Sequence, residues 1–182
     1  MSIRETQEAL CVVRAQQGDR DAFANLVDTY DRRLLYFIRR LIGETDEASD
    51  VVQSVWLQVH RSLRKLKSPR AFRVWLYRIA HAQAMTLLRQ RMSAEELFET
   101  LEDLDVPMDS NEFAISENAE LIHLALQDLS VVHRRVLVLR FLEDMTIEEI
   151  AQVLECSSGT VKSRLYYARV SLRQRITEMN HD

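Results

Sequence analysis

The sequence predicts an all-α fold: two small helical domains joined by an acidic linker, with a helix-turn-helix in the second domain. Only 3 glycines and 2 prolines occur among the 182 residues, whereas an all-β chain needs many tight turns built on such residues. Apolar side chains recur at helical spacing over most of the chain. With 47% hydrophobic and 29% charged residues, the chain can bury a core, which argues against wholesale disorder.

The N-terminal part of the chain is predicted to form four helices, each supported by apolar residues at helical spacing. They span residues 4–17, 21–42, 46–66 and 71–91. Gly18 and Gly43 flank the second helix, where a glycine can adopt a backbone angle that other residues resist. In the third helix the apolar side chains fall within about 80° of arc, and Asp50, Ser54 and Arg61 project from the opposite face.

Residues 93–117 are predicted to be the acidic linker between the two domains. Residues 95–133 hold 11 acidic side chains and no Lys or Arg, and Pro107 interrupts the segment. Such a composition is typical of a linker, and a solvated acidic loop is the alternative. The domains then span residues 1–92 and 118–182.

The second domain is predicted to hold three or more helices. Helices are expected over 118–129 and 131–142, and a third starts after Thr146. Thr146 and Glu149 have the spacing of a capping box, in which each side chain bonds to the backbone of the other residue. A sharp helix start is therefore expected at Thr146.

The next turn and helix complete a helix-turn-helix pattern. Glu155 and Cys156 turn the chain, Ser157 can cap the following helix, and Gly159 lies in a Ser-Ser-Gly-Thr turn. This last helix is expected to extend to about Ile176. An ordinary amphipathic helical hairpin is the alternative interpretation.

This last helix has an apolar side and a polar side. Val161, Leu165, Ala168 and Leu172 cluster within about 60° on a helical wheel and are expected to face the core. The opposite side and its flanks combine small polar, aromatic and basic groups, which suit the major groove of DNA because they can contact base edges and phosphates. The members of this polar side are Gly159, Thr160, Lys162, Ser163, Tyr166, Tyr167 and Arg169.

Charge is segregated along the chain, although the net charge is only −4. Residues 51–94 hold 9 basic side chains and no acidic one. The positive charge of this segment favours an anionic partner. Basic stretches interleaved with aromatic residues are typical of proteins that hold single-stranded nucleic acid. Phe72 and Trp75 are assigned to the core, whereas Tyr77 and His81 lie off the apolar stripe and are candidates for stacking.

No catalytic residue, metal site or cofactor is expected. The 5 histidines are scattered without metal-ligand spacing, and Cys11 and Cys156 are too far apart in sequence for a disulfide framework or a zinc site. Cys156 is interpreted as a small buried side chain. The N-terminus lacks an apolar signal core, and no apolar run approaches the ~18 residues of a membrane span. The expected compartment is a reducing cytoplasm.

Three segments resemble a known family. The segments Arg70-Ala-Phe-Arg-Val-Trp-Leu-Tyr-Arg-Ile-Ala and Gly159-Thr-Val-Lys-Ser-Arg-Leu-Tyr-Tyr-Ala-Arg resemble the two signature segments of bacterial RNA polymerase sigma factors of the extracytoplasmic-function (ECF) group. The segment Asp50-Val-Val-Gln-Ser-Val-Trp-Leu is similar to the same family. The resemblance extends from about Gly18 to Ile176, in the family's order.

The resemblance implies partners and site residues. The first domain is expected to bind core RNA polymerase and the −10 promoter element, and the second to read the −35 element. An anti-sigma factor is a further expected partner. Expected core polymerase contacts are Asp46, Glu47, Asp50, Gln53 and Ser54. Expected −10 contacts are Arg64, Lys65, Lys67, Arg70, Arg73, Tyr77, Arg78 and His81. Expected −35 contacts are Ser158, Gly159, Thr160, Lys162, Ser163, Arg164, Tyr166, Tyr167 and Arg169.

The sequence departs from the family pattern at a few positions. It has His81-Ala82 and Thr86-Leu87 where the family often has Arg-Asn and an Asp-Tyr pair, and Tyr167 where a basic residue is frequent. Two alternatives remain open at this point. One is a sigma-like decoy that binds an anti-sigma factor without initiating transcription, and the other is a helix-turn-helix regulator that acts without polymerase.

Overall fold

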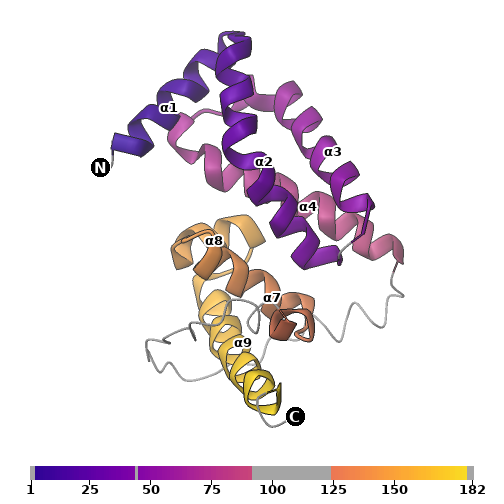
Figure 1. The fold of residues 1–182 in the computed structure, drawn as a ribbon. Helices are drawn as coiled ribbons and strands as arrows, with labels where there is room; N and C mark the ends of the chain where they lie inside the picture. Colours follow the sequence, from indigo (N-terminus) through magenta and orange to yellow (C-terminus); the bar gives the residue numbers. More distant parts are fainter. Residues whose placement is uncertain (1–2, 44, 92–123, 180–182) are drawn as a thin grey trace. The chain divides into compact units, whose positions relative to one another are not determined.

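The computed structural model describes residues 3–43, 45–91 and 124–179, and all regular elements in these ranges are helical (Figure 1). The chain divides into two compact units, Met1–Leu88 and Arg89–Asp182, here called the N-terminal and C-terminal units. The all-α fold class, with two helical parts, is therefore confirmed. The predicted linker over residues 93–117 lies outside the described residues.

The N-terminal unit is organised around its second helix. Its elements are α1 (Ile3–Gln16), α2 (Arg20–Ile42), α3 (Glu47–Ser62), two short 3-10 helices η1 (Leu63–Lys65) and η2 (Pro69–Ala71), and α4 (Phe72–Arg91). Helix α2 packs against both α1 and α3. Its aromatic side chains also reach α4, because the rings of Tyr30 and Phe72 lie 5.8 Å apart and those of Phe37 and Tyr77 lie 5.3 Å apart.

The ends of α2 lie where the sequence predicts them. The Asp19 carboxylate accepts the backbone N–H of Ala22 at 3.0 Å, which caps the helix. Gly43 ends the helix with a φ of 92°, and Gly18, before the cap, has a φ of 96°. Both angles lie in the region that favours glycine, so the breaks predicted at these two residues are confirmed.

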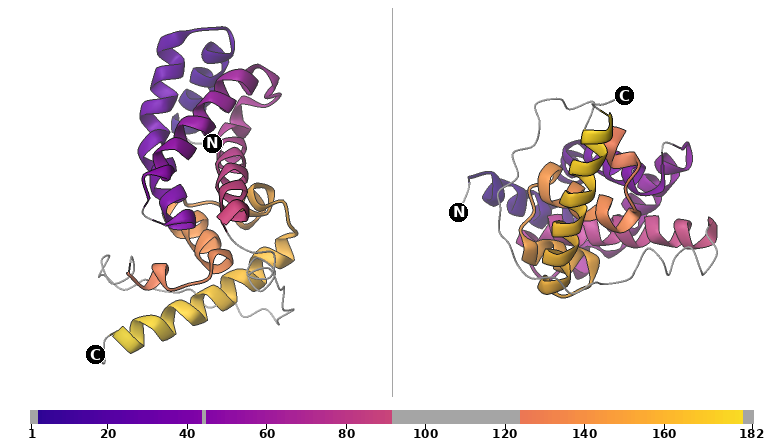
Figure 2. Two further views of the ribbon diagram at one scale, coloured as in Figure 1. Left: turned by 90° about the vertical axis from the view of Figure 1, so that its right-hand side faces the viewer. Right: turned by 90° about the horizontal axis from the view of Figure 1, so that it is seen from below.

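The C-terminal unit is organised around its last helix. Its elements are α7 (Val131–Leu137), η3 (Val138–Leu142), α8 (Ile147–Leu154) and α9 (Ser158–Met179), and residues 124–127 are also helical. Helix α9 packs against both α7 and α8 and extends well past α8 (Figure 2). The helix expected over 118–129 falls partly outside the described residues.

The helix predicted over residues 131–142 is present, but its second half, η3, is a π-helix. The N–H of Glu143 bonds to the carbonyl of Val138 at 3.1 Å, five residues back instead of four. Residues 135–139 are all buried. The wider turn allows an uninterrupted run of side chains to lie inside the unit.

The turn before α9 differs from its prediction. Gly159 was expected in a turn, but it lies within the first turn of α9. Ser157 caps the helix as predicted, because its hydroxyl accepts the N–H of Thr160 at 3.0 Å. A helix capped at this residue already includes Gly159. The left-handed residue of this turn is Glu155, with a φ of 53°.

Two kinds of feature are absent from the part of the chain that the structure describes. No helix among the described residues is long and apolar enough to cross a membrane. Within the same ranges, no group of three or more His, Cys, Asp or Glu side chains is placed to hold a metal ion.

Candidate nucleic-acid interface

The inner side of α9 is the side that the helical wheel predicts. Val161, Leu165, Ala168 and Leu172 are its buried residues, and they face a core that includes α7 and α8. The capping box at Thr146 and Glu149 is present in both directions, with distances of 3.2 and 2.9 Å. The predicted start of α8 is therefore confirmed, and α8 supports α9 as in a helix-turn-helix.

The outer side of α9 presents a cation and two tyrosines. Lys162 is exposed, Tyr166 is 39% exposed, and Tyr167 is half-buried. The two tyrosine rings meet edge to face, with centroids 5.5 Å apart, so each restricts the other's orientation. In a DNA groove, the ammonium group can contact phosphates, and the ordered aromatic rings can contact thymine methyl groups.

Hydroxyl groups at the start of α9 are oriented by bonds within the helix. The hydroxyls of Ser157 and Thr160 lie 2.9 Å apart, and the Ser163 hydroxyl donates to the Thr160 carbonyl at 3.0 Å. Ser158 is half-buried and Gly159 is exposed, so the backbone is accessible here. Ser157 was not among the predicted site residues, although its position before the helix indicated a cap.

Two of the predicted −35 arginines lie against their own unit. The guanidinium of Arg169 lies over the Phe141 ring, 5.4 Å from its centroid. Burial, followed by the charge of Arg140, lowers the pKa of Arg169 below its ordinary value. Arg164 donates to the Cys156 sulfur at 3.9 Å. Lys162 is the more accessible cation of this part of α9.

A second basic surface lies between α3 and α4, on the segment Leu63–Ala71, here called the basic loop. The side chains of Arg64, Lys65, Lys67 and Arg70 are all exposed. Arg78, farther along α4, is also exposed, whereas Arg73 and His81 are half-buried. Such a group of cations without a nearby acidic residue in the sequence attracts phosphates.

The interpretation of Tyr77 as a surface residue is wrong. Its side chain is 0% exposed and lies in the core against Phe37. The buried residues of α4 around this position are Leu76, Tyr77, Ile79 and Ala80. Because nearly consecutive residues point to different sides of a helix, the buried side of α4 is wider than one apolar stripe. Trp75, assigned to the core, is only half-buried, with its ring 6.1 Å from that of Phe72.

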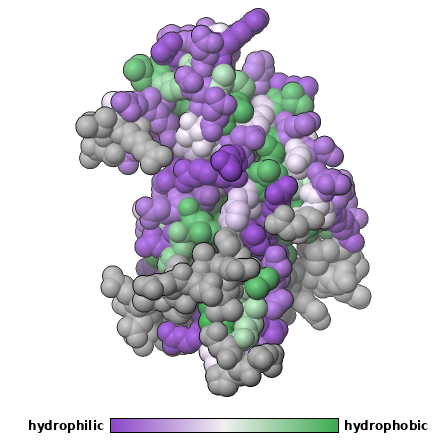
Figure 3. All heavy atoms as spheres, in the orientation of Figure 1, coloured by the Kyte–Doolittle hydropathy of each residue, from purple (hydrophilic) through white to green (hydrophobic). Residues whose placement is uncertain are grey.

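The polar face of α3 comprises the five predicted core polymerase contacts, and each of them is exposed. Leu57 lies on the same face and is 58% exposed. It was missed because only polar residues were considered, although it follows Gln53 and Ser54 at helical spacing. On the face of the molecule that Figure 3 draws, apolar side chains are scattered among hydrophilic ones, and single exposed apolar side chains are ordinary on proteins. Leu57 is notable only for its place among the five predicted contacts of α3.

Family models match both units. The model for sigma-70 region 2 matches residues 26–94, and the model for sigma-70 region 4 matches residues 119–172. The chain is 33% identical to the RNA polymerase sigma-H factor of Pseudomonas aeruginosa, with 93% of this chain and 94% of that protein covered. It is 32% identical to the ECF RNA polymerase sigma-E factor of Haemophilus influenzae, with 97% and 98% covered.

The chain belongs to the ECF group of sigma-70 family RNA polymerase sigma factors. A solved sigma factor structure shares its fold. It is the sigma factor RpoE in complex with the anti-sigma factor NepR from Bartonella quintana, with a TM-score of 0.66, 21% identity, and 85% of this chain and 96% of that chain covered.

The three surfaces of this sigma factor fall in two different family regions. The polar face of α3 and the basic loop lie within the region 2 match, and the outer side of α9 lies within the region 4 match. Helix α1 precedes the region 2 match entirely. The role of α1 in the sigma factor is therefore inferred from the contacts that α1 makes within the N-terminal unit.

Proposed function

We propose that this sigma factor binds core RNA polymerase through the polar face of α3 and directs it to promoters in the cytoplasm. The basic loop takes the −10 element, and the outer side of α9 takes the −35 element. The observation that carries the proposal is the presence of two separate cationic surfaces in the two family regions. One is a loop with four exposed cations, and the other is a capped recognition helix with Lys162 and Tyr166 outward.

Two surfaces separate this proposal from the two alternatives: the basic loop argues against the decoy, and the polar face of α3 argues against the regulator. A decoy that only binds an anti-sigma factor has no need of an exposed cationic loop. A regulator that binds duplex DNA alone has no need of the exposed polar face of α3. We further propose an anti-sigma factor as a partner, which is supported by the likeness to a sigma factor solved with one.

Transcription with purified components tests the proposal. The chain is mixed with core polymerase and fragments of its host's genomic DNA, and the 5′ ends of the transcripts are mapped. We expect starts that require the chain and share two upstream elements. A mixture that yields no start above core polymerase alone refutes the proposal and favours the decoy. Tight operator binding by the chain without polymerase favours the regulator.

Two variants on α9 test the role of its outer side. Lys162→Ala should weaken promoter binding and reduce the salt dependence by about 0.9 log unit per log unit of salt, as for one lost phosphate contact. Arg175→Ala is the matched control, since it also removes one positive charge but from a residue that pairs with Glu178 at 3.1 Å near the end of the helix. Equal losses in both variants would contradict a local contact at Lys162.

A further inference from the structure

We propose that Gln16 is a positioning residue for promoter opening, because it holds the basic loop in place from α1. Its side-chain nitrogen Nε2 donates to the carbonyl of Leu63 at 2.9 Å and to the carbonyl of Leu66 at 2.8 Å. A glutamine amide has two N–H donors, and both are used on one segment that follows 47 and 50 residues later in the chain. The proposal rests on the proposed function.

The two carbonyls belong to the first residue of η1 and to the residue that follows η1, where regular structure ends. The Leu63 carbonyl also accepts the N–H of Leu66 at 3.0 Å, which closes η1. Leu66 then turns to an extended conformation, with φ −69° and ψ 109°. Because its two bonds span this change, Gln16 fixes the direction in which the chain leaves η1.

The exposed cations lie within the segment that Gln16 holds and shortly after it. Arg64 and Lys65 lie within η1, Lys67 follows Leu66, and Arg70 lies in η2. All four side chains are exposed. Their backbone positions therefore depend on the geometry that Gln16 maintains, while their charged ends stay available to a nucleic acid.

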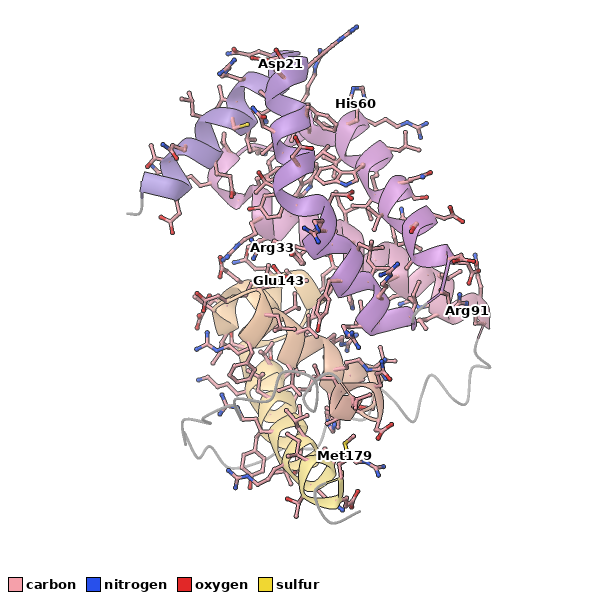
Figure 4. The ribbon with its side chains drawn as sticks, viewed as in Figure 1. Asp21, Arg33, His60, Arg91, Glu143 and Met179 are labelled. Carbon is pink, nitrogen blue, oxygen red and sulfur yellow. The ribbon has the colours of Figure 1, made fainter. Side chains whose placement is uncertain are left out.

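Other contacts of α1 and the turn after it support the same placement. Helix α1 packs against both η1 and η2, the two ends of the basic loop. A side-chain carbon built on Gly18 would lie 3.8 Å from Nη2 of Arg64, so the turn approaches the loop closely. Asp21 and His60, from the start of α2 and the end of α3, lie at this same end of the N-terminal unit (Figure 4).

Ordering the loop in advance favours binding. A loop that has to be fixed at the moment of binding loses backbone conformational entropy, and this cost lowers affinity. Gln16 reduces this entropy cost because it orders the loop before the DNA binds. We therefore expect its loss to slow capture of the opened −10 strand without changing the binding of core polymerase.

The test compares Gln16→Met with Gln17→Met. Methionine keeps the length of the glutamine side chain but donates no hydrogen bond, and Gln17 is an exposed glutamine at the next position. Amide hydrogen exchange of residues 64–71 in the free chain measures the order of the loop. Promoter opening by the polymerase complex is measured at the strongest start found in the transcription experiment. Core affinity and thermal midpoint are measured in parallel.

Gln16→Met should speed exchange in the loop several-fold and slow promoter opening about tenfold, which corresponds to about 1.4 kcal/mol. Core affinity should stay within about twofold, and Gln17→Met should behave like wild type. Gln16→Asn, which keeps the amide on a shorter side chain, should be intermediate. It also provides a readout if the methionine variant folds poorly.

Several results would overturn the proposal. Unchanged exchange in the loop would show that Gln16 does not order it. Faster exchange with unchanged opening would show that this order does not serve the promoter. A parallel loss of core affinity would make Gln16 a general structural residue. Failure of the wild-type chain to open any promoter would instead refute the proposed function, and this is recognised without the variants.

Discussion

Leu165→Ala should strongly destabilise the C-terminal unit while leaving the stability of the N-terminal unit unchanged. Leu165 is 4% exposed on the inner side of α9, and a leucine-to-alanine change at such a site costs about 2–5 kcal/mol. The helices described in this unit lie within residues 124–179, and a domain of roughly 60 residues has a free energy of unfolding of only about 3–9 kcal/mol. The substitution therefore removes a large share of the stability of this unit.

The magnitude can be stated as a temperature. A loss of about 3 kcal/mol in a domain of this size lowers Tm by roughly 12–24 °C. The neighbouring substitution Tyr166→Ala truncates a side chain that is 39% exposed and should change Tm far less. The two substitutions in adjacent residues are thus expected to affect different properties. Tyr166→Ala should reduce DNA binding, and Leu165→Ala should reduce stability.

The distribution of tryptophan provides the assay. Both tryptophans, Trp56 and Trp75, lie in the N-terminal unit, so tryptophan fluorescence follows that unit alone. Far-UV circular dichroism follows both units. We expect Leu165→Ala to shift the circular dichroism midpoint of the C-terminal unit and to leave the fluorescence midpoint unchanged. An equal shift in both signals would refute independent unfolding, and no shift in either would refute the assignment of Leu165 to the core.

Three further predictions follow from contacts in the N-terminal unit. Tyr30→Phe, which removes the hydroxyl that donates to the Glu8 carboxylate, should cost about 1–2 kcal/mol in urea unfolding followed by fluorescence. The N–H of Ala22 holds the pKa of Asp19 below its ordinary value, so its carboxylate stabilises the fold above that ordinary pKa, and this contribution is lost as the pH falls through the folded-state pKa. Asp19→Asn, which keeps the cap, should therefore flatten the acid side of the stability profile measured by thermal unfolding. Asp50→Arg should reduce core polymerase affinity about tenfold in a pull-down titration with Tm unchanged, because the residue is exposed.

The parts of the fold that depend on local pattern could be predicted from the sequence. The buried side of α9 and the capping box at Thr146 follow from spacing within one helix, and both are present as predicted. The breaks at Gly18 and Gly43 follow from the backbone freedom of glycine. Each of these features depends only on neighbours within a few residues.

The features that depend on distant contacts could not be predicted. Tyr77 was assigned to the surface because a single apolar stripe does not reveal that its ring packs against Phe37 of α2. The two bonds of Gln16 reach residues 47 and 50 positions later in the chain, and no local pattern points to them. The left-handed Glu155 was missed because glycine is the usual signal for that conformation.

The π-helix η3 has a consequence for how the chain tolerates changes in length. Because its turn spans five residues instead of four, η3 holds one residue more than an ordinary helical turn would hold between α7 and the turn at Glu143. A single-residue deletion here can be absorbed by reverting to ordinary helical winding. The same deletion within α8 would rotate its apolar side away from α9. Relatives that differ by one residue in this part of the C-terminal unit can therefore keep their recognition helix pointing the same way.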